Sequence, residues 1–402
     1  MITEINDIFT EINDLWMRKT SAVRVFSHLL PLTSHLFIFL LLLSSCGLRK
    51  QTAAGDNAVS AQPVGPAFCA DSAYAFCEAQ CDFGPRTMNS QAHDDCGTWI
   101  MEKFKSYGMS VTPQQTLLKG YDGTMLRATN IIASYRPELT DRILICAHWD
   151  SRPWADNDPD EANHRKPVLA ANDGASGVAV MLELARLLSL QFTVDSLQMI
   201  TSAAESSAAE PLSAAESSAA DQPTDISSVN RKPSTVNNNL GVDFICFDAE
   251  DWGTPQWDDT PSDGDTWALG AQYWAANPHV DGYTARYGIL LDMVGGQGAQ
   301  FYQEQQSLHY ARSIVDKVWR ASQVVGFGSF FPSREGVGIT DDHLPVNRVA
   351  KIPCIDIIPY YPDCPQSSFG PTWHTVNDDM AHIDRNTLQA VGQTLIQVLW
   401  SE

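Results

Sequence analysis

The chain has 402 residues, 44% of them hydrophobic, which is enough apolar material for one large folded core or two average domains. Its 26 basic and 48 acidic side chains give a formal net charge of −22. A surface with this charge repels polyanions, so we expect no nucleic-acid partner. Two interpretations of the charge remain open: solubility, or attraction of substrates that carry a free amine.

The N-terminus has the features of a bacterial lipoprotein signal. Three basic residues within 18–24 precede an apolar run from Leu36 to Leu43, and the box Leu-Ser-Ser-Cys ends at Cys46. The apolar run is too short for an ordinary membrane-spanning helix. We therefore expect residues 1–45 to be a cleaved signal peptide and Cys46 to be lipidated. A simple membrane anchor and an ordinary cleaved signal are the alternatives.

Lipidation of Cys46 would attach the protein to the membrane of the bacterial cell envelope, facing the periplasm. The residues before Met17 look superfluous, so the true start is either Met17 or Met1 with an unusually long basic region. From residue 46 to 68 the chain carries the lipid site and a stretch typical of a flexible tether. We expect the catalytic domain to occupy 69–402.

The folded part begins with helical spacing of apolar residues from Asn89 to Tyr107, with Asn89 or Ser90 as the N-cap. Two strands around a Gly-Tyr-Asp-Gly turn follow between Val111 and Tyr135. Apolar strands then alternate with amphipathic helices, which favours a single α/β domain with a central twisted, mostly parallel sheet flanked by helices. The expected strands are 142–148, 242–248, 287–294 and 351–358, and the expected helices are 177–190, 267–276, 308–322 and 386–400.

One stretch interrupts this alternation. The octapeptide SAAESSAA occurs at 202–209 and again at 213–220, and a polar segment continues to Asn239. This composition has almost nothing to bury. We expect a low-complexity insertion at about 196–239 that forms a surface loop without a catalytic role.

Acidic and imidazole side chains follow four of the expected strands, and Asp173 lies in the loop before the first long helix. Because the carboxyl ends of parallel strands meet at one edge of a sheet, these side chains can converge. Carboxylate and imidazole are the ligands of a catalytic zinc ion, which keeps one position for water or substrate. The strand-end residues are His148, Asp150, Glu250, Asp251, Asp292 and His374.

Glu250 and Asp251 are adjacent, just past the strand 242–248. Such a pair can divide its work, with one carboxylate binding a metal while the other moves protons. An isolated acidic pair in a loop is usually only solvated. The motifs around this pair favour the catalytic interpretation.

Seven motifs in combination give the chain a family resemblance. They are FGPR, ILICAHWDSR, LAANDGASGVAVMLELAR, FICFDAEDWG, LLDMVGG, GITDDHLPV and PTWHTVNDD. From about Phe83 to Leu399, apart from the insertion, the chain resembles the zinc-dependent glutaminyl cyclases of the zinc aminopeptidase-like superfamily. The resemblance implies a glutaminyl-peptide cyclotransferase, an acyltransferase that converts the N-terminal glutamine of peptides or proteins to pyroglutamate and releases ammonia.

The resemblance also assigns roles to individual residues. It makes Asp173, Asp251 and His374 the ligands of one zinc ion, and Glu250 the general acid and base. Animal members carry a glutamate where Asp251 stands, so the metal would lie slightly nearer the backbone here.

Further residues are assigned to the substrate side of the site. Asp292, with the pair Asp341 and Asp342, would form a hydrogen-bond network around the reacting amide. Trp257 and Trp373 match tryptophans that shape the substrate pocket. Asp356 replaces a histidine of the animal enzymes, which leaves the role of that position open.

A two-zinc aminopeptidase is the alternative enzyme. It would add His148 and Asp292 as ligands of a second zinc ion, with Asp173 bridging and Glu250 activating water. We prefer the cyclase because the DDHLPV block and Trp373 look like the cyclase branch. A lipid-anchored binding module would need broken chemistry, and none of the motifs looks broken.

Overall fold

The structure is a computed structural model that describes residues 62–208, 237, 239–258 and 265–402. For residues 192–208 only the backbone is described. The expected signal peptide, the lipidation site Cys46 and most of the tether lie outside the described residues. No helix within the described ranges combines the length and hydropathy of a membrane-spanning segment.

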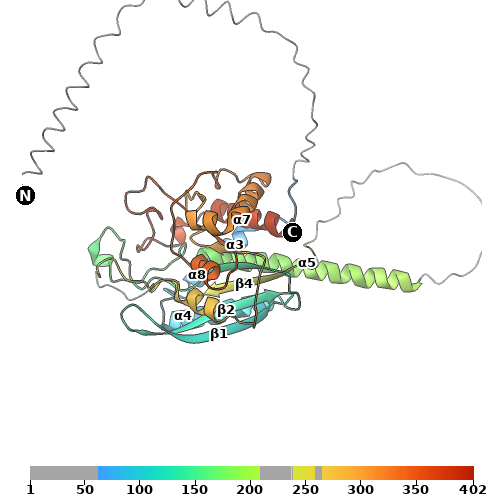
Figure 1. Ribbon diagram of the computed structural model, residues 1–402, viewed down its shortest axis with the longest axis horizontal. Coiled ribbons are helices and arrows are strands. Elements are labelled where there is room, and N and C mark those ends of the chain that lie inside the picture. The colour runs from blue at the N-terminus through green and yellow to red at the C-terminus, as the bar shows by residue number, and fades with distance from the viewer. Residues whose placement is uncertain (1–61, 209–236, 238, 259–264) are drawn as a thin grey trace, which may run out of the picture. The chain divides into compact units, whose positions relative to one another are not determined.

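A six-stranded sheet with the order β1-β2-β4-β3-β5-β6 forms the centre of the fold (Figure 1). β3 runs parallel to both β4 and β5, and β5 runs parallel to β6, whereas the β1–β2 and β2–β4 pairs are antiparallel. This arrangement confirms the predicted mostly parallel sheet. The strands are β1 (Ser110–Lys119), β2 (Met125–Tyr135), β3 (Arg142–His148), β4 (Gly241–Phe247), β5 (Gly288–Leu291) and β6 (Cys354–Ile357).

The burial of the strands explains their composition. Every residue of β3 and β4 is buried, as expected of parallel strands that are covered on both faces. The edge strand β1 alternates exposed and half-buried residues, and its Leu117 is 63% exposed. Continuous apolar runs therefore lie at the middle of the sheet.

Helices cover both faces. Side chains of α3, α4, α5, α7 and α9 share one core with Ile143 and Ile145 of β3, whereas α6 and α8 pack with Leu144 and Cys146 on the opposite face. The helices are α3 (Ala70–Cys81), α4 (Gln91–Ser106), α5 (Ala175–Ala208), α6 (Leu269–Ala276), α7 (Gln305–Val324), α8 (His343–Arg348) and α9 (Arg385–Trp400), with short 3-10 helices η1 (Glu161–Asn163) and η2 (Met380–His382).

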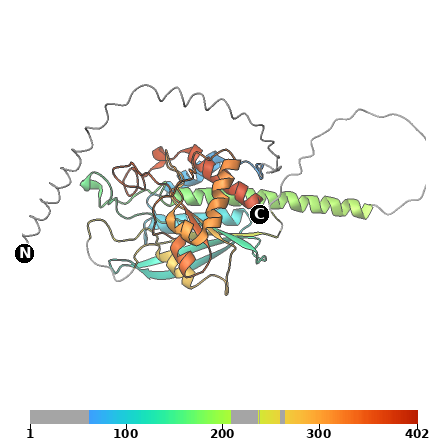
Figure 2. The same cartoon turned by 45° about the horizontal axis from the view of Figure 1, so that its top comes forward.

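The predicted helices form close to their expected positions. Ser90 caps α4, because its hydroxyl accepts a hydrogen bond from the His93 amide at 3.1 Å. α5 continues to Ala208, past the expected start of the insertion, and Figures 1 and 2 show this green helix running alongside the strands and then beyond them. Residues 209–236 of the insertion lie outside the described ranges.

The sequence did not predict α3 and α8. α3 is rich in small residues and has little amphipathic character, while α8 is only 6 residues long and contains a proline. Tertiary packing stabilises both helices: α3 lies against α5 and α9, and α8 lies against α6 and β6.

Gly177 allows the start of α5 to approach the sheet. A Cβ at this position would lie 2.7 Å from the Ala147 Cβ and even closer to the Leu291 carbonyl oxygen. Only a residue without a side chain fits between the helix and strands β3 and β5. This close approach helps to fix the position of the loop that carries Asp173.

Gly177→Ala should therefore lower the free energy of unfolding. Overpacking costs about 1–3 kcal/mol, which exceeds the gain of up to about 1 kcal/mol from better helix propensity. Urea unfolding followed by circular dichroism measures the change. Gly336→Ala is the control, because its added methyl group would meet no atom closer than 3.3 Å. Equal or greater stability of Gly177→Ala would contradict the proposed close packing.

Candidate metal centre

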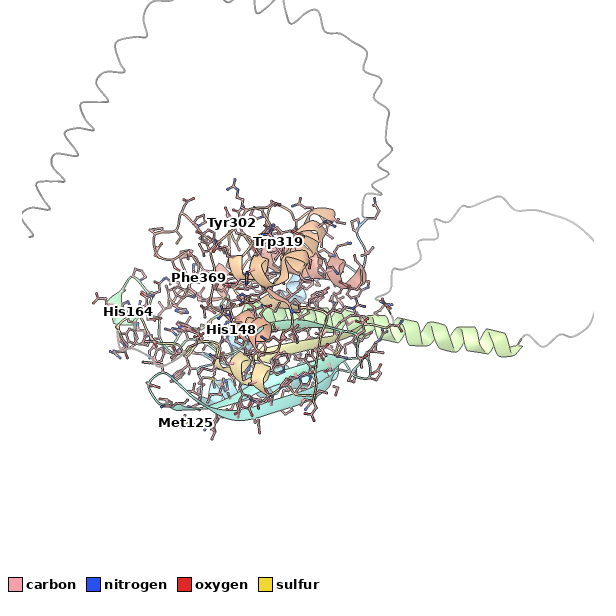
Figure 3. The ribbon with its side chains drawn as sticks, viewed as in Figure 1. Met125, His148, His164, Tyr302, Trp319 and Phe369 are labelled. Atoms are coloured by element: carbon pink, nitrogen blue, oxygen red, sulfur yellow. The ribbon has the colours of Figure 1, made fainter. Side chains whose placement is uncertain are left out.

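The strand-end residues converge at the carboxyl edge of the sheet. His148 is the last residue of β3, Asp292 directly follows β5, and Asp173 precedes α5. Glu250 and Asp251 lie just after β4, and His374 comes from the long loop before α9. Figure 3 labels His148, which ends β3.

Asp173, Asp251 and His374 form the first group. The His374 Nε2 atom lies 3.3 Å from Asp251 Oδ1 and 3.6 Å from Asp173 Oδ2. All three side chains are buried, and one possible ligand atom of each lies within 4.8 Å of the others. The structure thus brings together the three residues that the family resemblance assigns to zinc.

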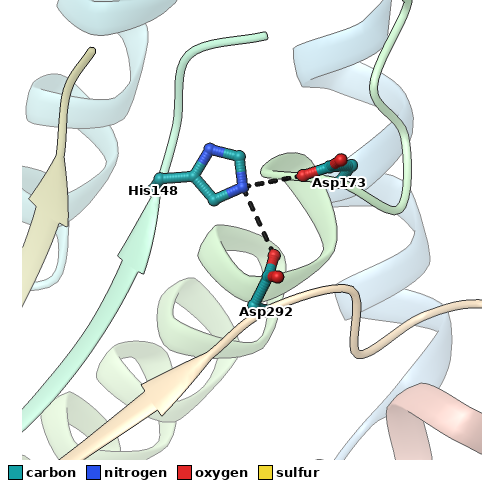
Figure 4. A group of neighbouring side chains, drawn as sticks. All are labelled: His148, Asp173 and Asp292. Atoms are coloured by element: carbon teal, nitrogen blue, oxygen red, sulfur yellow. Dashed lines mark hydrogen bonds and ion pairs between the residues drawn. The ribbon is translucent and has the colours of Figure 1, made fainter. Parts of the chain in front are cut away.

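His148, Asp173 and Asp292 form a second group beside the first (Figure 4). The His148 Nε2 atom lies 3.0 Å from Asp173 Oδ1 and 3.3 Å from Asp292 Oδ1. Asp173 therefore faces the first group with Oδ2 and the second with Oδ1. This is the arrangement that the two-zinc alternative requires of a bridging carboxylate.

Two buried aspartates hold the backbone of the candidate ligands. The Asp150 carboxylate accepts hydrogen bonds from the Glu250 and Asp251 amides at 3.0 and 3.1 Å. The Asp378 carboxylate likewise accepts hydrogen bonds from the amides of Asn172 and Asp173, at 2.7 and 3.0 Å. Each ligand-bearing turn is thus fixed by a carboxylate that is not itself one of the candidate ligands.

His374 is oriented by a buried ion pair behind it. Its Nδ1 atom lies 3.3 Å from Asp156 Oδ1, and the Arg152 guanidinium binds both oxygens of Asp156 at 3.0 and 2.7 Å. Burial opposes ionisation of Asp156, but His374 and Arg152 outweigh it and lower the pKa of this carboxyl. An anionic carboxylate at Nδ1 leaves Nε2 free to bind a metal.

Strained backbone lies next to the site. Ala249, Met293 and His374 have φ angles of 52°, 50° and 53°, in the left-handed region that residues other than glycine rarely adopt. Ala249 precedes Glu250, Met293 follows Asp292, and His374 is itself a candidate ligand. Such strain persists where the surrounding structure fixes the chain for function.

The electrostatics of the site favour a cation. Burial raises the pKa of Asp251, and it raises the pKa of Asp292 to about 6. Asp251 Oδ2 and Asp292 Oδ1 are buried and accept no hydrogen bond from the described residues, although Asp292 Oδ1 has an ion-pair contact with His148 at 3.3 Å. A divalent cation would satisfy both oxygens and would offset the cost of burying these carboxylates. The side chains present therefore fit a metal ion.

A pocket of about 290 Å³ opens onto these residues. Trp373 stacks on the His374 ring at 3.7 Å between centroids, and Trp267 stacks on it at 5.9 Å. Glu250 lies in the lining, and burial raises the pKa of its carboxyl well above the ordinary value. The lining comprises Asp173, Glu250, Trp267, Asp292, Met293, Gly338, Ile339, Thr340, Asp341, Ile358, Phe369, Trp373 and His374.

Two residues predicted on the substrate side do not line this pocket. Trp257 packs near Trp154 and His164 and does not line the pocket. Asp342 is also absent from the lining, whereas its neighbour Asp341 is present. A larger hollow of about 460 Å³ lies between α7 and α9. Its lining contains no histidine, so it lacks the imidazole that each candidate metal group has.

Sequence analysis missed several residues of the site. Trp267 and Phe369 line the pocket, and Asp156 and Asp378 support the candidate ligands. Asp378 stands four residues after His374 in the motif PTWHTVNDD, so its position there was a signal. Trp267, Phe369 and Asp156 do not come directly after an expected strand, so strand-end position did not point to them.

Comparison with known proteins identifies the family. The sequence pattern of peptidase family M28 matches residues 130–399. The chain belongs to peptidase family M28. Among solved structures, Bacteroides thetaiotaomicron glutaminyl cyclase bound to N-acetylhistamine is 46% identical with a TM-score of 0.71, and the match covers 84% of this chain and 99% of that one.

Two other similarities fit M28 membership. A leucine aminopeptidase precursor from Bacteroides thetaiotaomicron is 46% identical with a TM-score of 0.70, covering 84% of this chain and 98% of that one. Glutaminyl-peptide cyclotransferase of Gloydius blomhoffii is 24% identical over 282 residues, which are 66% of this chain and 63% of that protein. The chain thus spans less than two thirds of the curated relatives it matches. These findings confirm the resemblance to glutaminyl cyclases.

The zinc cofactor that the sequence predicts is the one that the family uses. Peptidase family M28 and the glutaminyl cyclases are zinc-dependent, and the described residues of this M28 chain include groups that can hold a metal ion. The number of zinc ions stays a prediction.

Asp378→Asn should weaken metal binding by about 10–100-fold, because the new amide group cannot accept both backbone hydrogen bonds that position Asp173. Competition with a chromophoric zinc chelator measures the affinity. Asp379→Asn is the matched control, since this neighbour caps η2 and does not contact Asp173. Unchanged affinity in Asp378→Asn would show that the turn holds its shape without this carboxylate.

Proposed function

We propose that this M28 chain is a glutaminyl-peptide cyclotransferase that converts N-terminal glutamine to pyroglutamate and releases ammonia. One feature carries the proposal: Glu250 lines an aromatic-walled pocket next to the group Asp173, Asp251 and His374. A metal and a proton carrier are what closure of glutamine on its own amine needs. The similarity to glutaminyl cyclases over 84% of the chain supports the same reaction.

In the proposed enzyme, Asp173, Asp251 and His374 would hold the metal ion. When bound there, zinc supplies a Lewis acid that polarises the γ-carbonyl oxygen of the substrate glutamine. The Asp150 and Asp378 carboxylates fix two of these ligands through the backbone, and Asp156 orients the third. The geometry is thus set before substrate arrives.

Glu250 would carry a proton from the α-amine to the departing amide nitrogen. Its carboxylate accepts a proton from the α-amine as the amine nitrogen attacks the γ-carbonyl carbon and a five-membered lactam forms. Glu250 then returns this proton to the departing amide nitrogen, which leaves as ammonia. The raised pKa of the buried Glu250 carboxyl suits a group that both accepts and donates a proton. Asp292 would hydrogen-bond the amide nitrogen during the exchange.

The walls of the pocket favour cyclisation over hydrolysis. Trp267, Phe369 and Trp373 present aromatic rings to the pocket, and Ile339 and Ile358 add aliphatic surface. Such a wall holds the glutamine side chain in a folded conformation and leaves little room for competing water. The reaction itself consumes no water.

Glu250→Gln should lower kcat for ammonia release from a glutaminyl peptide by about 10²–10⁴-fold, because the amide cannot accept the proton. Zinc content and thermal stability should stay unchanged. A coupled ammonia assay and elemental analysis of the same sample make the measurement. Glu161→Gln, an exposed carboxylate in η1, is the control. Full activity of Glu250→Gln would remove this residue from the proposed role.

The second candidate is a two-zinc aminopeptidase. The group His148, Asp173 and Asp292 favours it, because Asp173 is placed to bridge two ions. The similarity to a leucine aminopeptidase precursor points the same way. The Trp373 ring against His374 and the wider set of glutaminyl cyclase neighbours favour the cyclase.

Substrate assays distinguish these candidates. We expect the purified protein to release ammonia from a glutaminyl peptide and to leave leucine amide intact. Prolonged chelation should abolish ammonia release because the Lewis acid is removed, and added zinc should restore it. The control is a peptide that begins with asparagine, which offers the same amide group on a shorter side chain. Hydrolysis of leucine amide without cyclisation of the glutaminyl peptide would establish the aminopeptidase instead.

We also propose that the enzyme is tethered to the bacterial cell envelope through lipidated Cys46 and faces the periplasm. The basic residues, the apolar run and the Leu-Ser-Ser-Cys box support this location. Substrates would then be exported peptides or proteins with N-terminal glutamine.

A further inference from the structure

A third group of metal-ligand side chains lies behind the substrate pocket. Asp341 lies in the turn before α8, His343 is the first residue of α8, and Asp356 lies in the middle of β6. One possible ligand atom of each lies within 4.8 Å of the others, and all three side chains are buried. We propose that Asp341, His343 and Asp356 form a further site for a divalent cation such as zinc, separate from the two groups around Asp173.

The first support is a set of buried atoms that have no hydrogen bond. The imidazole of His343 is 0% exposed, and neither of its nitrogens has a hydrogen-bond partner among the described residues. The same holds for both carboxylate oxygens of Asp356 and for Asp341 Oδ2. Leaving this many polar atoms without a hydrogen bond in the interior is costly. A bound cation would satisfy an atom of each residue at once.

The second support is the environment of the imidazole. His343 Nδ1 faces Asp356 Oδ2 at 3.9 Å, and its Nε2 faces Glu304 Oε2 at 3.4 Å. Glu304 is fixed as the N-cap of α7, where it accepts hydrogen bonds from the amides of Gln306 and Ser307. A carboxylate held rigidly at one imidazole nitrogen directs the other nitrogen toward a metal.

This arrangement repeats the design of the first metal group. There, the His374 Nδ1 atom faces Asp156, and Nε2 faces two candidate carboxylate ligands. Here, Nε2 faces Glu304 and Nδ1 lies on the side of Asp356. Both groups therefore offer one imidazole and two carboxylates, with a further carboxylate behind the imidazole. This donor set is one that zinc accepts.

The third support is charge. Three buried carboxylates, those of Glu304, Asp341 and Asp356, lie near His343, and the neighbouring Asp342 carboxylate is also buried. None of the four forms an ion pair with a lysine or arginine among the described residues. Burial and the neighbouring carboxylates raise the pKa of Asp356 well above its ordinary value. A divalent cation would compensate this charge, whereas a single imidazolium would leave most of it unbalanced.

The site has an entry path and a consequence for the enzyme. Asp341 lines the substrate pocket, so a cation can reach the group from there. Ligation through Oδ2 would leave Oδ1 bonded to the Asp342 amide, as it is now at 2.5 Å. The cation would thus fix Asp341 as an anionic wall of the pocket.

The test counts metal ions. Protein stripped by a chelator is dialysed against zinc chloride, and bound zinc per chain is measured by elemental analysis. We expect Asp356→Asn to bind one zinc ion fewer than the unmodified protein. Asp251→Asn should retain the zinc ion that Asp341, His343 and Asp356 bind. Asp363→Asn, an exposed carboxylate in the loop after β6, is the control and should bind as much as the unmodified protein. Equal zinc content in Asp356→Asn and the unmodified protein would overturn the proposal.

A second measurement uses the unmodified protein and does not depend on how a variant folds. Crystals grown with zinc and measured on both sides of the zinc absorption edge should show an anomalous peak between Asp341, His343 and Asp356. No peak there, in crystals that show one beside His374, would mean that the buried carboxyls are neutralised by protons instead. Ammonia release is assayed on the same samples, so loss of the proposed cyclase activity and loss of this site are separate results.

Discussion

Negative charge buried at the carboxyl edge of the sheet is the constraint around which this M28 chain is organised. Glu250, Asp251 and Asp292 lie out of solvent in one small volume, together with Asp173, which contacts both imidazoles of the site. Burial raises the pKa of the Glu250, Asp251 and Asp292 carboxyls, so these three resist ionisation. The buried guanidinium of Arg152 compensates only the side nearest Asp251 and Asp156. A divalent cation bound by these side chains would compensate the buried negative charge.

The rest of the fold holds those charges in position. Parallel strands bring their ends to one edge, and close packing at Gly177 fixes the helix that follows the Asp173 loop. Carboxylates that accept backbone amide hydrogen bonds then set the turns themselves, while strained residues such as Ala249 aim the following side chain. The energy for that strain comes from the packed sheet on which the turns are built.

One scaffold can carry two chemistries because Asp173 faces two groups. Its Oδ2 atom belongs with His374, and its Oδ1 atom belongs with His148. Ligand types alone do not choose between cyclisation and hydrolysis. In the proposed cyclase, the aromatic rings of Trp267 and Trp373 against His374 would favour a folded glutamine side chain, because both residues line the pocket beside the candidate ligands.

The sequence alone determined the mostly parallel sheet and the candidate ligands. Buried parallel strands need continuous apolar runs, and His148, Glu250, Asp251 and Asp292 lie at or just past the ends of such runs, so they are visible in the order of residues, whereas the family resemblance supplied Asp173 and His374 as ligands. Tertiary structure alone decided which carboxylates support the turns, because Asp150 and Asp378 act on residues about 100 and 205 positions away in the chain. It also brought Trp267 to His374 and surrounded His343 with carboxylates. Contacts of this kind depend on how separate elements pack, and no local pattern encodes them.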